Sequence, residues 1–196
     1  SDILNNFKIS NPEWKIEFYD DNMCYNFIKS NYNDNLAQLF LSIKDGPIKA
    51  DLFRICILYK NGGLYTDIDN IILEPLDSII NKECTFGVGA SYLPNLLNPA
   101  FIFSTKENPI LLECINLYEN LISLYPYTYW DYSIVYCMSF VLKKYLNIEN
   151  KSKIYYLSDS NQIIQTFEEN LDCTWKDFFK IIFNPNNSIV SYFYLF

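Results

Sequence analysis

The stretch "KADLFRICILYKNGGLYTDIDN", residues 49–70, decides the fold expected for this chain. Residues 47–60 are predicted to form a helix, because Pro47 suits a first helical turn and the glycine pair that follows Asn61 suits a helix end. Apolar residues occupy nearly every face of this helix, which predicts that it is buried. A strand is expected next, over residues 63–69.

Asp51 and Arg54 are the only charged residues between positions 51 and 59 of this helix. Their i, i+3 spacing places both side chains on one face. A buried ion pair adds little net stability, because the cost of removing both charges from water offsets their attraction. We therefore favour a functional pair that faces a cleft, with a satisfied pair inside the core as the alternative.

Asp67 and Asp69 have the spacing of a strand, which points both carboxylates to one face. Two neighbouring carboxylates repel each other unless a proton or a cation lies between them. Oxygen ligands alone suit Mg²⁺ or Mn²⁺. Short motifs of this kind also occur by chance, so a hydrated loop stays open as the alternative.

The rest of the chain alternates between expected strands and helices. Strands are predicted at 14–19, 84–90, 100–104 and 153–158, and helices at 22–31, 35–44, 109–124, 131–146, near 174–183 and in a short turn after Pro75. A loop that contains Pro94 and Pro99 is expected between two of the strands. This alternation predicts a single α/β domain over residues 1–196, with a mixed, mostly parallel sheet flanked by helices.

Composition limits the class of protein. Half of the 196 residues are hydrophobic and 18% are aromatic, which predicts a globular chain. The formal net charge is -8, and no run of Lys or Arg provides the basic stripe needed for nucleic acid, so no nucleic-acid partner is expected. We also expect no transmembrane segment, because no uncharged apolar stretch is long enough to span a bilayer.

Histidine and cysteine usage narrows the chemistry. The chain contains no histidine, which excludes Ser/His and Cys/His catalysis and His-based zinc sites. Its six cysteines form no CxxC pair and several lie in apolar runs, so we expect buried free thiols in a reducing, cytoplasmic compartment. Abundant Asn, Ile, Lys, Tyr and Phe suggest an AT-rich genome, such as that of a large DNA virus in its host.

Residues 11–80, which also contain "NPEWKIEFYDD", resemble the DXD-motif sugar transferase family. This family includes fungal initiating mannosyltransferases and capsular polysaccharide transferases, and shares a core with large glucosylating toxins. The resemblance implies a GT-A-type nucleotide-sugar-binding fold. It also implies that a UDP- or GDP-sugar donates its sugar, with retention of configuration, to a hydroxyl of a glycan or protein acceptor, and that Mn²⁺ or Mg²⁺ is required.

The resemblance also assigns roles to individual residues. Asp51 and Arg54 would hold the donor sugar and its diphosphate, and Tyr65 would contact the nucleotide. Asp67 would reach hydroxyls of the donor and the cation, and Asp69 would bind the metal directly.

"NPAFIFSTKENPILLECI" matches the family more weakly, and places Asn98 near the reacting centre beside the catalytic pair Asp51 and Arg54. Two features depart from the family. The sequence starts after the family's usual first strand, so that part of the donor site is expected to be absent, supplied by residues upstream of Ser1 or rebuilt by the C-terminal segment. The C-terminal "NNSIVSYFYLF" has neither the His nor the Trp that often lies near the cation. Ser188 or Ser191 in place of that ligand stays an open alternative.

Other interpretations stay open. The chain can be a non-catalytic relative that binds a sugar nucleotide or a glycan without turnover. A dehalogenase-like phosphatase motif fits poorly, because Thr66 and Asn70 occupy positions where that motif needs other residues. Glu113 and Asp131 are expected to be surface charges, and the aromatic residues between 125 and 130 to form either a core edge or a stacking surface for a sugar ring.

Overall fold

A computed structural model describes residues 2–67, 70, 72, 74–91, 96–124, 133–144, 146, 153–157, 161–168 and 192–195. The helices are α1 (Asp2–Ser10), α2 (Asp21–Asn31), α3 (Asp34–Ser42), α4 (Gly46–Asn61), α5 (Leu76–Ile79), α6 (Pro109–Leu124) and α7 (Ile134–Lys143). The strands are β1 (Ile16–Tyr19), β2 (Gly63–Thr66), β3 (Phe86–Ala90), β4 (Leu97–Ser104), β5 (Lys153–Leu157), β6 (Gln162–Glu168) and β7 (Tyr192–Leu195).

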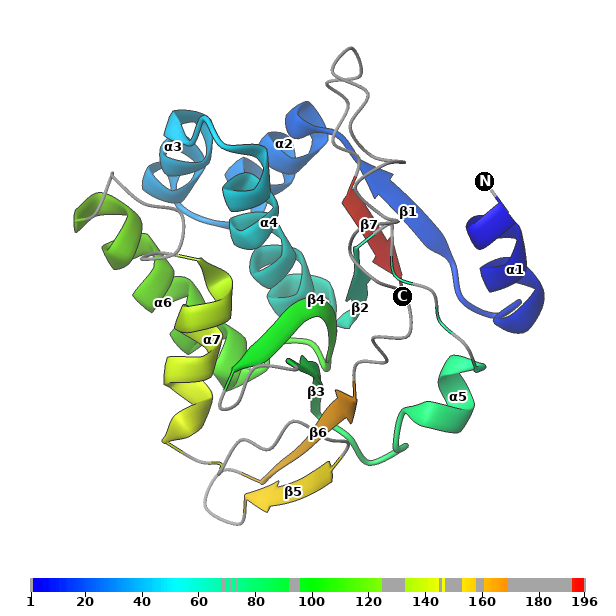
Figure 1. Ribbon diagram of the computed structural model, residues 1–196. Helices are drawn as coiled ribbons and strands as arrows, with labels where there is room; N and C mark the ends of the chain where they lie inside the picture. Colours follow the sequence, from blue (N-terminus) through cyan, green and yellow to red (C-terminus); the bar gives the residue numbers. More distant parts are fainter. Residues whose placement is uncertain are drawn as a thin grey trace, which may run out of the picture.

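The strands form one mixed sheet in the order β1-β7-β2-β4-β3-β6-β5 (Figure 1). Among the described strands, only β3 and β6 pair in parallel, and the other neighbouring pairs are antiparallel. The α/β class is confirmed and is consistent with a GT-A-like fold, but the expectation of a mostly parallel sheet was wrong. β1 and β2 do run in the same direction across α2, α3 and α4, yet β7 lies between them and is antiparallel to both.

Helices cover both faces of the sheet, because its side chains alternate between two apolar clusters. The larger cluster joins α2, α3, α4, α6 and α7 to residues such as Tyr65 and Ile102 on one face. The smaller cluster joins Leu64 and Phe103, on the other face, to Phe7 of α1 and Leu76 of α5. Figure 1 shows these two groups of helices on opposite sides of the strands.

Helix α4 lies inside the larger layer, and every residue from position 51 to position 58 is buried. It ends where Gly62 adopts φ 71°, a value that favours glycine, and the Gly62 N–H donates to the carbonyl of Leu58. The chain then enters β2 directly. The predicted helix, its end and the following strand are therefore confirmed, with the strand ending at Thr66.

The structure confirms several other expectations from the sequence and contradicts one. The predicted helices at 22–31, 35–44 and 109–124 and the strand at 14–19 are confirmed within a few residues. The expectation that Pro99 lies in a loop was wrong, because β4 begins earlier and includes it. α1, β6 and β7 were not predicted. The helix expected near 174–183 and the aromatic residues at 125–130 lie outside the described residues.

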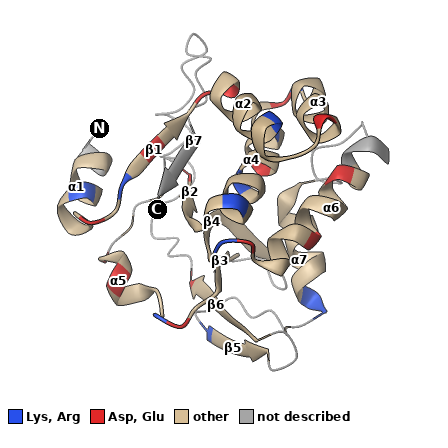
Figure 2. Cartoon of the chain, turned by 180° about the vertical axis from the view of Figure 1, so that it is seen from behind, with Lys and Arg blue, Asp and Glu red and all other residues tan. Residues whose placement is uncertain are grey.

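Charge and hydropathy follow this layering. Strands β2, β3 and β4 contain no charged residue, and Figure 2 shows charged positions on the helices, on the connecting segments and on the outer strand β1. Five cysteines are free and buried, as expected, and Cys173 lies outside the described residues; the five are Cys24, Cys56, Cys84, Cys114 and Cys137. Among the described helices, none is long and apolar enough to cross a membrane.

Candidate donor-binding site

Four of the predicted site residues come together where α4 packs against the end of β2. Arg54 on α4 lies between two carboxylates: its Nη2 is 3.1 Å from Asp51 Oδ1 and 3.6 Å from Asp67 Oδ1. Tyr65 on β2 donates its hydroxyl to Asp67 Oδ1 at 2.8 Å. We refer to Asp51, Arg54, Tyr65 and Asp67 as the polar cluster.

Arg54 is held rigidly. Its Nε donates to the carbonyl of Ala50 at 3.3 Å and its Nη1 to the carbonyl of Pro99 at 2.8 Å. The guanidinium also lies over the ring of Tyr65, with Cζ 4.5 Å from the ring centroid. Because the guanidinium is planar and fixed on several sides, its charge is preorganised and needs no rearrangement to act on a bound anion.

Asp51 is only 3% exposed, and both of its oxygens are engaged. Oδ1 faces Arg54, and Oδ2 accepts from the backbone N–H of Ile134, the first residue of α7, at 3.2 Å. Burial raises the pKa of Asp51 to about 6, while Arg54 and the Ile134 hydrogen bond act in the opposite direction. In this arrangement Asp51 orients Arg54 and anchors α7.

Asp67 is the exposed member of the polar cluster. It follows the last residue of β2, and its side chain is 36% exposed. Burial raises the pKa of Tyr65, so the phenol stays protonated and donates to Asp67 Oδ1. Oδ2 has no partner within the described part of the chain and is left for a ligand.

The oxygen ligand at this end of the sheet is of the type that binds a hard divalent cation. A partly exposed carboxylate oxygen is a ligand that Mg²⁺ and Mn²⁺ favour, and such sites keep positions for phosphate oxygens. Among the described residues, no three acidic or sulfur side chains gather into a complete metal site. Asp69, the other predicted ligand, lies outside the described residues.

Two backbone carbonyls of β4 complete the surroundings of the polar cluster. On the side of β3, Ile102 pairs with Val88 and Asn98 pairs with Gly89, so residues 99–101 bulge out of the ladder. The bulge directs the Pro99 carbonyl to Arg54 and the Ala100 carbonyl to the N–H of Asp67, at 2.9 Å.

Asn98, the predicted residue near the reacting centre, lies at the start of this bulge. Its Oδ1 accepts from the N–H of Ala100 at 3.1 Å, so it shapes the bulge that supplies the two carbonyls. The structure therefore brings Asn98 next to the residues that surround Arg54, and Asn98 is half-buried there.

Several partners of the polar cluster could not be predicted from the sequence. The N–H of Ile134 and the carbonyls of Pro99 and Ala100 are backbone groups, which carry no side-chain signal; only the Asn-Pro pair before Ala100 hinted at an irregular strand. Ser133, next to Ile134, is fully buried, and its hydroxyl has no hydrogen-bond partner in the described part of the molecule.

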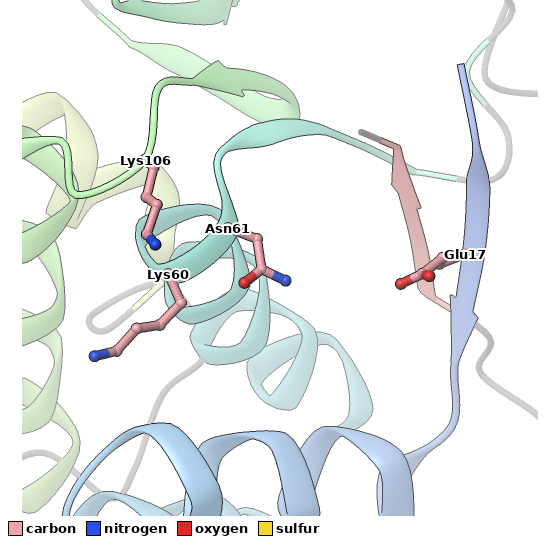
Figure 3. Close-up of a pocket in the computed structure, with 4 residues that line it drawn as sticks. All are labelled: Glu17, Lys60, Asn61 and Lys106. Carbon is pink, nitrogen blue, oxygen red and sulfur yellow. The ribbon is translucent and has the colours of Figure 1, made fainter. Parts of the chain in front are cut away.

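A cavity of about 380 Å³ shares no lining residue with the polar cluster. Figure 3 shows its lining residues: Lys60 and Asn61 at the end of α4, Lys106 after β4, and Glu17 on β1. Lys60 is six positions beyond Arg54 on α4, roughly 9 Å along the helix axis. None of the four lining residues belongs to the polar cluster, and two lysines and one glutamate give this cavity mixed charge.

Glu113 behaves as expected for a surface charge, because it forms a partly exposed ion pair with Lys144. Asp131, Ser188 and Ser191 lie outside the described residues.

Comparisons with known proteins find a family model and curated relatives that match part of this chain. Residues 1–86 match the family model described as "Glycosyltransferase sugar-binding region containing DXD motif". The chain is 36% identical over 75 residues to an initiation-specific alpha-1,6-mannosyltransferase of Candida albicans, which covers 37% of this chain and 20% of that protein. It is 29% identical over 107 residues to the mouse (Mus musculus) lactosylceramide 4-alpha-galactosyltransferase, covering 55% and 27%.

An uncharacterized protein of Arabidopsis thaliana is 31% identical over 134 residues, covering 60% of this chain and 19% of that protein. The matches therefore span between 19% and 27% of the length of these three relatives. No solved structure matches the chain significantly. These matches support the resemblance to the DXD-motif sugar transferase family that the sequence indicated, and the family model covers residues 1–86 of this chain.

Proposed function

We propose that this chain transfers a sugar from a nucleoside-diphosphate sugar, with a UDP or GDP leaving group, to a hydroxyl of a glycan or protein acceptor, with Mn²⁺ or Mg²⁺ as cofactor. The observation that carries the proposal is the polar cluster, in which a buried and fixed Arg54 lies beside the partly exposed Asp67. Relatives whose names state mannosyl and galactosyl transfer support the reaction class.

The charges of the cluster support the proposed requirement for a cation. Asp51 and Asp67 together outweigh Arg54, so a diphosphate would meet a net negative site. A divalent cation bound at Asp67 would offset this repulsion and stabilise the charge that builds on the leaving diphosphate. Asp69 is proposed as its second protein ligand.

Arg54 supplies the permanent positive charge. Departure of the sugar from the diphosphate places negative charge on the leaving oxygens, and a fixed guanidinium in a site of low dielectric stabilises that charge without reorganisation. Asp51 and the ring of Tyr65 keep the guanidinium in place. Retention of configuration is proposed from the family resemblance, and proton NMR of the anomeric centre of the product tests it.

A donor screen tests the function. Release of UDP or GDP from a panel of nucleotide sugars would be measured with Mn²⁺, with Mg²⁺ and with a chelator. We expect release that depends on the cation, and a loss of at least about 100-fold in Asp67→Asn, because this change keeps the shape and the acceptor for Tyr65 but removes the charge. Asp77→Asn, an exposed carboxylate on α5, is the matched control and should stay within about twofold of the wild-type rate.

Two results would count against the proposal. Release that is insensitive to both the chelator and Asp67→Asn would exclude this site as the centre of reaction. Cation-dependent binding of UDP or GDP without release from any donor would favour the non-catalytic alternative.

A further inference from the structure

The side chain of Asn70 makes two hydrogen bonds close to Asp67. Its Nδ2 donates to the carbonyl of Ala100 at 2.8 Å and to Thr66 Oγ1 at 3.0 Å. A carbonyl can only accept, so the contact with Ala100 fixes which end of the carboxamide carries the nitrogen. Asn70 is therefore tied both to the bulge of β4 and to the last residue of β2.

Asn70 and its two partners also surround the backbone of Asp67, through bonds to its N–H partner and to its carbonyl. The N–H of Asp67 donates to the carbonyl of Ala100, which also receives Asn70 Nδ2. The carbonyl of Asp67 accepts from the N–H of Asn70 at 3.1 Å and from Thr66 Oγ1 at 3.3 Å. The Thr66 hydroxyl thus accepts from Asn70 and donates to Asp67, which forms a short hydrogen-bonded chain in a buried position.

We propose that Asn70 is a positioning residue for Asp67, and that its carboxamide sets the affinity of this site for the divalent cation. The proposal rests on the function proposed above. The side chain of Asp67 is held by Tyr65 and Arg54, whereas its backbone is held by Ala100, Thr66 and Asn70. Without the carboxamide, Asn70 loses its side-chain bonds to Ala100 and Thr66. Only the backbone bonds of Asp67 then hold this position, and the carboxylate that faces the cation loses part of its fixed direction.

Manganese binding tests this inference without relying on turnover. Free Mn²⁺ would be measured by electron paramagnetic resonance during titration of the protein, with and without UDP. We expect Asn70→Ala to raise the Kd for Mn²⁺ by about tenfold, in the range typical for loss of a residue that orients a metal ligand. Asn31→Ala is the matched control, because the exposed Asn31 donates a single bond to the carbonyl of Phe27 within its own helix.

Thr66 provides a second pair of variants. Thr66→Val removes the hydroxyl that joins Asn70 to Asp67 and should also raise the Kd by about tenfold, whereas Thr66→Ser keeps the hydroxyl and should bind Mn²⁺ as the wild type does. If the residues act through one path, the double variant Asn70→Ala/Thr66→Val should be little worse than either single variant. Should Asn70→Ala fail to fold, as judged by circular dichroism, the two Thr66 variants make the same comparison.

The outcomes separate this inference from the function it rests on. Equal Mn²⁺ binding by the wild type and by folded Asn70→Ala or Thr66→Val would overturn the positioning role and leave the proposed function standing. Absence of Mn²⁺ binding by the wild type, with and without UDP, would overturn both.

Discussion

At the scale of single residues, the polar cluster is a set of charges that a folding chain avoids unless each has a partner. Arg54 and Asp51 are both almost fully buried, and removal of either partner would leave an uncompensated charge in the core. The cluster solves this by giving the guanidinium two ion pairs, two hydrogen bonds to carbonyls and a contact with the ring of Tyr65, and by giving the Asp51 carboxylate two partners. Asp67 is the member of the cluster whose side chain is most exposed to a ligand.

Asp51 should make stability depend on pH. Burial raises its pKa to about 6 in the folded protein, above its ordinary value in the unfolded chain. Between about pH 4 and about pH 6 the folded protein therefore holds a proton that the unfolded chain has released, so this contribution to stability falls as the pH rises through that window. Relative to Asp51→Asn, the wild type should gain on the order of 3 kcal/mol in free energy of unfolding between pH 7 and pH 4.

Urea denaturation of both proteins at pH 7, 5 and 4 measures this difference. The comparison with Asp51→Asn cancels the titration of the other carboxylates, which both proteins share. A difference in free energy of unfolding that stays constant across these pH values would contradict the buried, charged Asp51 described here.

At the scale of elements, the bulge of β4 connects the sheet to the site. Its neighbour on β3 is Gly89, where an added Cβ would lie 2.7 Å from the carbonyl oxygen of Asn98. Such a contact is too short for any real side chain, so glycine is what allows β3 and β4 to approach at this point. The approach fixes where Pro99 and Ala100 present their carbonyls.

Gly89→Ala should therefore weaken both the fold and the site. We expect a loss of about 2 kcal/mol in free energy of unfolding from overpacking, and a fall of roughly tenfold in nucleotide release as the carbonyl of Pro99 moves away from Arg54. Denaturant unfolding and the donor assay measure the two effects. The neighbouring change Ala90→Gly adds no clash and should leave nucleotide release unchanged; an equal fall in both variants would contradict this account of the bulge.

At the scale of the whole molecule, packing buries the described thiols: Cys24, Cys56, Cys114 and Cys137 lie in the larger apolar cluster, and Cys84 is buried just before β3. Burial raises the pKa of Cys84 to about 11 and keeps the pKa values of Cys24 and Cys56 above the ordinary range, so little thiolate forms at neutral pH. We expect N-ethylmaleimide to leave the five described cysteines unmodified in the folded protein and to modify them all in urea. Peptide mapping by mass spectrometry checks each site, and rapid modification of any one of the five under native conditions would contradict the described packing.

The sequence by itself determined the local features of this protein. The apolar helix with Asp51 and Arg54 three positions apart, its glycine end and the strand before Asp67 all depend on neighbours in the chain, and short-range spacing specifies them. Together with the alternation of strands and helices, these features predicted the α/β class. They also pointed to Asp51, Arg54, Tyr65 and Asp67 as members of one site.

Only the tertiary structure decided the direction of most strand pairs and the backbone partners of the site. β7 comes from the end of the chain and lies between β1 and β2, and the partners of Arg54 and Asp51 on Pro99 and Ile134 are 45 and 83 positions away. Strand alternation cannot reveal such an insertion, because its signal is local. Backbone N–H and carbonyl groups are the same in every residue, so which of them faces a buried charge is fixed by packing and not by residue type.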